Sequence, residues 1–499
     1  MTRIKKFIVN NMQAKKIDSM PYRTSCATNL NVIKSKLAHN SLVELRLGFE
    51  ENEFGTKHDV QSLIKVIKCQ FYARLSLHKY SCLKSICIGW RLPNFALGPI
   101  LQVVIPLLLI EPVRIIHIQL ILNEKTSVPE ECLRRIVSWP TLECLDLRSI
   151  SLRVRVPQKY QCQPRIMPPS IQTTRHKKIL HQLILHQQQD RETNSNNVDS
   201  TEMNGRNNDG EWKQANVVDI IPYVSLSVKT LKLMDCSINQ HHIVKLCQFI
   251  RLRMHGLKNL SLRQNFTLDG GYDDLFSLPC IKSLDISLCD LDETDGCIIG
   301  ECILNRKNKN LDRLSLAGNY RMSNTIPDVV LSAASTLKEL DCSFCGLNSK
   351  SQQRVFDNLA NVSTCSIESV RMQGIMLNDV EGLVNCVRNN NSLRHLVIDH
   401  PHETYSISAK GANAILGAIK SNYSIETLTL DVIPNQLLDD ILNEIEFWLK
   451  LNRCGRRALL QTNNENYVKS WASILSQGAM SNDCNVVFWL LRHGSVHFT

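Results

Sequence analysis

Cys342 and Cys345 are separated by two residues, the spacing at which cysteine pairs hold zinc. A tetrahedral zinc site needs two further ligands, and no second pair with suitable spacing follows in the chain. The adjacent His241 and His242 fit the start of a helix better than a metal site. We therefore expect no metal site, and no residue pattern points to another cofactor.

The motifs that mark common catalytic sites are absent from the sequence. It contains no Gly-rich phosphate loop with a lysine, no G-x-S-x-G elbow, no H-E-x-x-H pair and no kinase signature. Glycine is scarce, with 20 in 499 residues, and the only adjacent pair is Gly270 and Gly271. These observations predict that the protein is not an enzyme.

The chain contains 19 cysteines, an odd number, and its start lacks the apolar stretch of a secretory signal. Such a pattern favours small buried thiols in a reducing compartment over disulfides. We expect a cytoplasmic location, with a nuclear one as the alternative, and the basic N-terminus leaves organelle targeting open. No run reaches the roughly 18 apolar residues that a membrane span requires.

A recurring phrase orders the chain: an aliphatic residue, two variable residues, a second aliphatic, one variable residue and a third aliphatic. From residue 228 onward the copies begin 24 to 32 residues apart, a step that a random Leu-rich sequence would not hold. Twelve copies begin at Leu42, Leu83, Val113, Leu142, Val228, Leu257, Ile281, Leu311, Leu337, Ile367, Leu393 and Ile425.

Position nine of the phrase is a second test, because Asn or Cys there can satisfy backbone groups where the chain leaves its strand. Five consecutive copies carry one of the two: Cys236, Asn265, Cys289, Asn319 and Cys345. Apolar residues at helical spacing fill the segments between phrases, as in 59–78, 378–390 and 409–421.

These features resemble the leucine-rich repeat, in its ribonuclease-inhibitor-like subclass, over 42–147 and 228–430. The resemblance implies an α/β solenoid, or horseshoe, with parallel strands on a concave face and helices on a convex face. It also implies binding of a protein partner through the concave face.

Five segments follow from this reading. Residues 1–40 are a basic N-terminal arm, 41–150 the N-terminal repeats, 154–216 a disordered polar insert, 221–433 the C-terminal repeats and 435–499 a helical C-terminal cap. The net charge of +11 gathers outside the repeats, with +7 in residues 1–43 and +6 in 151–192. The insert contains 176–186, which is either a short partner-docking helix or a cover for the break in the solenoid.

The C-terminal segment begins with apolar residues at helical spacing over 435–452, followed by Leu451-Asn452-Arg453-Cys454-Gly455-Arg456-Arg457. This LNRxGRR phrase resembles the tail of uncharacterised leucine-rich repeat proteins from unicellular eukaryotes, and it carries no known activity. The end of a solenoid exposes an apolar face that needs a cap, which this segment would supply. We expect its arginines to pair with nearby acids, with anion binding as the alternative.

Strand alternation sends positions three, five and seven of the phrase to the concave face. We interpret the polar strip there as a partner-binding surface, with a solvated strip of mutually paired charges as the alternative. Trp90 and Phe344, at position eight, are the hot-spot candidates. The strip in the middle of the arc comprises Arg263, Asp285, Arg313, Glu339, Asp341 and Arg371.

The sequence thus predicts a non-enzymatic interaction scaffold that binds a protein partner whose identity it does not reveal. One alternative is a GTPase-regulating protein, since some solenoids of this subclass activate small GTPases. Another is a nucleic-acid-associated protein that uses the two basic segments, 1–43 and 151–192, and it predicts salt-sensitive binding.

Overall fold

The structure is a computed structural model of the chain, which divides into two compact units, Met1–Leu152 with Ala215–Thr499, and Arg153–Gln214. The described residues are 8–9, 44–47, 85–89, 117–121, 127–155, 212–266, 268, 270–305, 307–361, 365–375, 377, 380–398, 407–430, 436–456, 473–480 and 484–494.

The first unit contains a parallel sheet whose thirteen described strands follow one another in chain order. Its strands are β1 (Ile8–Val9), β2 (Glu44–Leu47), β3 (Ser85–Gly89), β4 (His117–Ile121), β6 (Cys144–Arg148), β9 (Thr230–Met234), β10 (Asn259–Ser261), β11 (Ser283–Asp285), β12 (Arg313–Ser315), β13 (Glu339–Asp341), β14 (Ser369–Arg371), β15 (His395–Ile398) and β16 (Thr427–Leu430). Each of the twelve predicted phrases therefore contributes one strand, and β1 adds an edge strand from within the predicted N-terminal arm.

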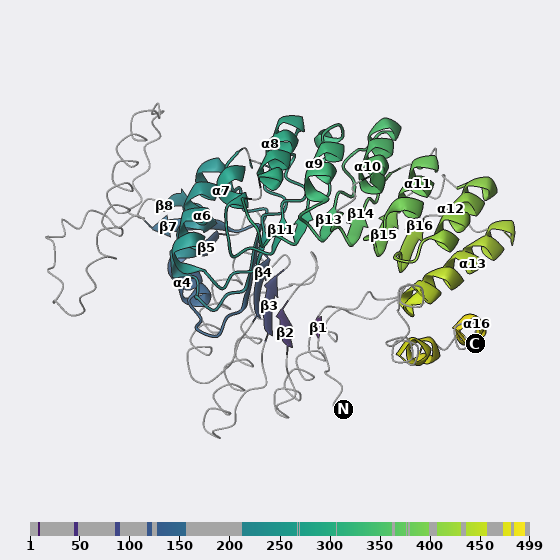
Figure 1. Cartoon of the computed structure of the whole chain (residues 1–499). Helices are drawn as coiled ribbons and strands as arrows, with labels where there is room; N and C mark the ends of the chain where they lie inside the picture. Colours follow the sequence, from purple (N-terminus) through teal and green to yellow (C-terminus); the bar gives the residue numbers. More distant parts are fainter. Residues whose placement is uncertain are drawn as a thin grey trace, which may run out of the picture. The chain divides into compact units, whose positions relative to one another are not determined.

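Helices alternate with these strands and lie along one face of the sheet (Figure 1), except the last, α16, which follows α13 beyond the final strand and contacts it. They are α4 (Glu130–Val137), η1 (Val217–Tyr223), α6 (Gln240–Arg253), α7 (Tyr272–Phe276), α8 (Glu293–Leu304), η2 (Tyr320–Met322), α9 (Ile326–Ala333), α10 (Ser349–Asn361), α11 (Glu381–Asn389), α12 (Ala409–Ser421), α13 (Gln436–Arg453) and α16 (Cys484–Gly494). Helix α12 has the predicted bounds, and α11 begins three residues later than predicted. The predicted helix over 59–78 lies outside the described residues.

The core lies between the sheet and the helices. Position four of each phrase pairs with position four of the next, as in Leu260 with Leu284 and Leu284 with Leu314. Both leucines that flank Leu314 in the phrase, Leu311 and Leu316, are buried as well. A leucine-rich-repeat solenoid has this architecture, with one short strand and one helix per unit stacked in register.

The frame of the third copy, predicted to begin at Val113, is wrong by two residues. Strand β4 pairs Ile118 with Ile86 and Leu120 with Ile88, and both Ile118 and Leu120 are buried. Its second and third aliphatics are therefore Ile118 and Leu120. The pairing with β3 and β6 decides between two frames that the local sequence allows equally.

The long step between the Leu142 and Val228 copies does not interrupt the sheet, because β6 pairs directly with β9. The chain departs at β7 (Ser151–Arg155) and returns through β8 (Trp212–Ala215). After β8, η1 contacts both α4 and α6 and so takes the place of a convex helix. Residues 156–211, which hold most of the predicted insert and its 176–186 segment, lie outside the described residues.

Asparagine at position nine bonds to the backbone of its own copy and the preceding one. The Asn319 amide nitrogen donates to the carbonyls of Leu316 (2.7 Å) and Ile286 (3.0 Å). Its oxygen accepts from the backbone N–H groups of Cys289 (2.8 Å) and Leu291 (3.3 Å). Asn265 makes the equivalent four contacts two repeats earlier. The prediction that position nine satisfies backbone groups where the chain leaves its strand is therefore confirmed.

Cysteine at position nine plays a smaller part in the same ladder. The Cys289 thiol donates to the carbonyls of Leu262 (3.3 Å) and Ser287 (3.4 Å). The Cys345 thiol does the same with Leu316 (3.3 Å) and Ser343 (3.7 Å). Burial raises the pKa of both cysteines to about 12, so each thiol stays protonated and able to donate.

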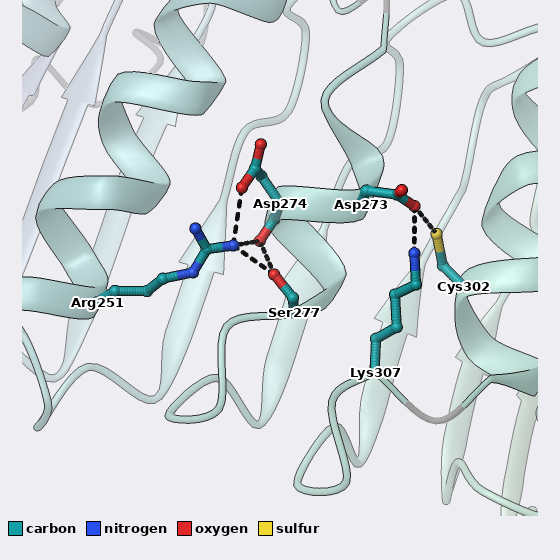
Figure 2. A network of polar contacts seen from close by, with 6 residues as sticks. All are labelled: Arg251, Asp273, Asp274, Ser277, Cys302 and Lys307. Carbon is teal, nitrogen blue, oxygen red and sulfur yellow. Dashed lines mark hydrogen bonds and ion pairs between the residues drawn. The ribbon is translucent and has the colours of Figure 1, made fainter.

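Polar contacts also join the convex helices α6, α7 and α8 (Figure 2). Arg251 of α6 pairs with the Asp274 carboxylate (2.8 Å) and bonds the Ser277 hydroxyl at the end of α7. Asp273, on the other side of α7, accepts from Lys307 Nζ (2.6 Å) and from the Cys302 thiol (3.1 Å). These contacts tie the short α7, a helix of five residues, to both of its neighbours.

A second asparagine ladder runs where the convex helices end, and it closes the solenoid. Asn390 donates to the Leu359 carbonyl (2.7 Å), and Asn422 donates to the carbonyls of Val387 (2.7 Å) and Asn390 (2.8 Å). Asn452 forms the next rung, donating to the carbonyls of Asn422 (3.1 Å) and Ile425 (2.8 Å). The Asn of the LNRxGRR phrase thus bonds the last repeat.

The arginines of that phrase behave differently from one another. Arg453 pairs with Glu446 (2.5 Å), as expected. For Arg456 the prediction of an acid partner is wrong. This side chain is 3% exposed and lies between the rings of Tyr423 (4.3 Å) and Trp448 (4.6 Å). It donates to the Lys420 carbonyl (2.5 Å). Arg457 lies outside the described residues.

Replacing Asn319 with Ala should lower the free energy of unfolding by about 3 kcal/mol, because it removes four hydrogen bonds to buried backbone groups. Thermal unfolding followed by circular dichroism would measure the shift. The control is Asn259→Ala, which removes one exposed contact to Thr230 and should cost less than about 0.5 kcal/mol. Equal shifts for the two variants would contradict the prediction.

Candidate functional site: a groove across strands β10 to β14

The face of the sheet opposite the helices is hollowed across β10 to β14. The hollow has a volume of about 570 Å³. Phe344 also lines it, whereas Trp90, the other hot-spot candidate, lies outside the described residues. The groove contains all six residues predicted for the middle of the concave face: Arg263, Asp285, Arg313, Glu339, Asp341 and Arg371.

Small side chains give the groove its depth. Position seven of three successive copies carries Ser287, Ala317 and Ser343, which form the floor. The same position carries Arg263 at the β10 end and Gln373 at the β14 end, where larger side chains limit the hollow. Sequence reasoning concentrated on charge and missed these small residues, although their place in the phrase was visible.

Position eight forms one edge of the groove and has a left-handed backbone in seven successive copies. Glycine adopts this conformation freely, whereas other residues pay about 1–2 kcal/mol. The φ angles lie between 51° and 77° at Ser149, Asp235, Gln264, Leu288, Gly318, Phe344 and Gly374.

The bulky members of this row lie over the glycines of the following copies. A Cβ added to Gly318 would approach Leu288 Cδ2 to 2.2 Å, and one added to Gly374 would approach Phe344 Cδ1 to 2.5 Å. Phe344 nevertheless remains 47% exposed. Leu288 and Phe344 thus form an apolar edge along four repeats, and Leu288 was not among the predicted site residues.

Position five supplies two carboxylates that hydrogen bonds hold in the same orientation. The Asp285 Oδ1 atom accepts from the Ser287 N–H (3.1 Å), and Asp341 Oδ1 accepts from the Ser343 N–H (3.1 Å). Asp285 also accepts from the hydroxyls of Ser287 (2.5 Å) and Ser261 (2.8 Å). Neither carboxylate forms an ion pair with any residue that the structure describes.

The three arginines of the groove are not equivalent. Arg313 pairs with Glu339 on the neighbouring strand at 3.1 Å, as the alternative of mutually paired charges expects. Arg263 and Arg371 form no ion pair with a residue in the described ranges. The groove therefore carries an unpaired cation near each end and two unpaired carboxylates between them.

The concave face over β6 and β9 differs, because its charges are already satisfied. The Asp146 carboxylate is 1% exposed, receives two 2.9 Å hydrogen bonds from Arg148 and lies 3.9 Å from Lys232 Nζ. The Ser149 hydroxyl donates to Asp235 at 2.6 Å. This part of the face offers a partner fewer uncompensated charges than the groove does.

The described cysteines fit a structural role. Cys342 and Cys345, the pair with zinc-like spacing, each donate a thiol hydrogen bond to a backbone carbonyl. Burial raises the pKa of Cys302 to about 12, with the Asp273 carboxylate adding to the rise, so this thiol is protonated at neutral pH. No cluster of metal-ligating side chains occurs in the described part of the chain.

Neither a scan against models of protein families nor a search of curated proteins finds a match to this chain. Among solved structures, the leucine-rich repeat-containing protein LegL7 from Legionella pneumophila is similar, at 10% sequence identity and a TM-score of 0.43. That similarity covers 81% of this chain and 97% of LegL7. The assignment of the fold rests instead on the strand register and the repeated core described above.

None of the helices within the described ranges is both long enough and apolar enough to cross a membrane.

Gly374→Ala should destabilise the protein by about 1–3 kcal/mol, because the new Cβ would press on Phe344 at a left-handed position. Gly417→Ala is the matched control: no atom lies within 4 Å of the new Cβ, and the residue is helical. It should stabilise by about 0.5–1 kcal/mol. Urea unfolding of both variants tests the pair, and a neutral Gly374→Ala would contradict the described packing.

Proposed function

We propose that this protein is a non-enzymatic scaffold of the ribonuclease-inhibitor-like subclass, which binds a protein partner through the groove across β10 to β14. Polar and charged side chains from β11 to β14 converge on that groove, together with Arg263 just after β10, over the core leucines Leu284, Leu314 and Leu340. Interfaces are usually anchored by a few aromatic and arginine side chains around a hollow. Phe344, Arg263 and Arg371 provide those groups here.

The observation that carries the proposal is the exposure of Phe344 at the groove edge. Phe344 is 47% exposed, so burial of its ring contributes only part of its possible stabilisation. Its left-handed backbone also carries strain that a glycine at this position would avoid. A partner that covered the ring would recover the apolar burial that the isolated chain forgoes.

The LNRxGRR phrase has a structural role within this proposal. It ends the solenoid by continuing the asparagine ladder with Asn452 and by seating Arg456 between two aromatic rings. The tail resemblance is therefore explained by a capping requirement that solenoids share. This role needs no ligand.

The proposed location is a reducing compartment, the cytoplasm or the nucleus. No disulfide joins the described cysteines, and several of their thiols serve as hydrogen-bond donors to carbonyls. Oxidation of such a thiol would remove that donor, so reducing conditions suit the fold.

Filling the groove should abolish partner binding. Ala317→Trp places a large side chain on the groove floor, where the existing residue is small and not part of the core. We expect proteins captured by the wild-type chain from native cells to be lost with this variant, as measured by quantitative mass spectrometry.

The matched control is Leu331→Trp, which changes an exposed residue of α9 on the convex side. It should retain the captured proteins. Both variants should melt within a few degrees of the wild type. Retention of every partner by Ala317→Trp would refute the groove as the binding surface.

A further inference from the structure

The two long sides of the groove differ in chemistry. One side is the apolar edge formed by Leu288 and Phe344 at position eight. Toward the other side lies position five, where Asp285 and Asp341 lie on β11 and β13 with Ser315 of β12 between them. The ion pair of Arg313 with Glu339 lies two residues earlier on β12 and β13 and also lines the groove. The floor between the two sides is Ser287, Ala317 and Ser343. A ligand that fills this groove therefore needs an apolar part and a cationic part.

The two carboxylates are ready to receive a cation. Their orientation is fixed by the matching bonds from Ser287 and Ser343, so little conformational entropy remains to be lost on binding. Both are only partly buried, and neither has an ion-pair partner among the described residues. Their hydrogen bonds come from neutral donors, and neither forms an ion pair with Arg371, which lies in register with Asp341 on the next strand, or with another described cation.

The spacing of the carboxylates suits a planar cation. Neighbouring strands lie about 4.8 Å apart, so residues two strands apart in the same register are separated by roughly 10 Å. Asp285 and Asp341 are two strands apart, each paired in register with Ser315. A guanidinium placed between the two carboxylates, with a charge-assisted hydrogen bond of about 2.8 Å from its nitrogens to each, spans a separation of that size. An ammonium is a smaller point charge and would reach one carboxylate at a time.

We propose that the groove binds an arginine side chain of the partner. Its aliphatic stem lies against Leu288 and Phe344, and its guanidinium lies between Asp285 and Asp341. An arginine is suited to such a site because it combines an apolar stem with a charged, fork-shaped end. The Phe344 ring adds attraction for the cation. This inference rests on the proposed function, since it names what the partner inserts.

The charges at the two ends of the groove define the residues around that arginine. Arg313 and Glu339 pair with each other, and the remaining charges follow the order cation, carboxylate, carboxylate, cation across β10 to β14, with Arg263 and Arg371 at the two ends. The complementary segment carries acids on both sides of its arginine. Arg263 and Arg371 lie four strands apart, roughly 19 Å, which an extended chain covers in about six residues. The acids are thus expected about three residues from the arginine on each side.

A random dodecapeptide library displayed on phage tests this proposal. Selection uses the full-length chain, and peptides that also bind Ala317→Trp are discarded, which leaves ligands of the groove. We expect these peptides to share one arginine with acidic residues on both sides. Replacing that arginine with norleucine in a synthetic copy should abolish binding measured by fluorescence anisotropy.

Variants of the chain then locate the arginine. Asp285→Asn and Asp341→Asn each keep an oxygen that accepts from the backbone N–H two residues later, of Ser287 and Ser343, but remove the charge. Each should weaken peptide binding about tenfold. Asp328→Asn, on α9 outside the groove, is the matched control and should leave binding unchanged. Circular dichroism confirms that all three variants are folded.

The outcomes separate this inference from the proposed function. Three results would overturn the arginine site and leave the groove as the binding surface. The groove-dependent peptides could lack a shared arginine, they could carry a lysine in its place, or their binding could be unchanged by both Asp→Asn variants. If every selected peptide also binds Ala317→Trp, or if none is selected, the arginine site and the groove-binding function both fail.

Discussion

The requirement that buried backbone groups find hydrogen-bond partners governs this architecture. Each strand of the described C-terminal repeats is only three to five residues long, so the chain turns away from the sheet once in every 24 to 32 residues. Every turn buries N–H and C=O groups that the strand ladder cannot satisfy. Asn265 and Asn319 satisfy them by bonding to the copy before their own. A repeat therefore depends on its neighbour, and stability is transmitted along the stack.

The same turn creates the groove edge. Leaving the strand requires a left-handed residue at position eight, and glycine fills that position in only two of the seven described copies. Leu288 and Phe344 accept a strained backbone and place their side chains over the glycines of the next copies. The strain, about 1–2 kcal/mol each, is comparable to what partial burial of an apolar side chain returns. The apolar edge therefore exists at little net gain to the isolated chain.

Much of this fold was readable from the sequence, because the phrase and its ninth position report a periodic core directly. The frame of the third copy could not be read from the sequence, because its closely spaced aliphatic residues allow two frames. Only the pairing of Ile118 with Ile86 and Leu145 on the neighbouring strands chooses between them. The continuity of the sheet across the long insert was also hidden, because the register of β6 with β9 involves residues 86 apart. The sequence could not show which charges form ion pairs either. Arg313 and Arg371 each lie in register with an acid on the neighbouring strand, Glu339 and Asp341, yet only Arg313 forms an ion pair.

The groove charges contribute little to holding the fold together. The Arg313–Glu339 pair is exposed on both sides, and exposed pairs stabilise by about 0.2–1 kcal/mol at most. Asp146 is the opposite case: it is buried, and loss of Arg148 would leave a carboxylate without its bidentate partner. Charge changes in the groove should thus alter binding while leaving the solenoid folded, whereas the same changes at β6 would act on stability. That separation would let the proposed binding surface and a structural surface share one sheet.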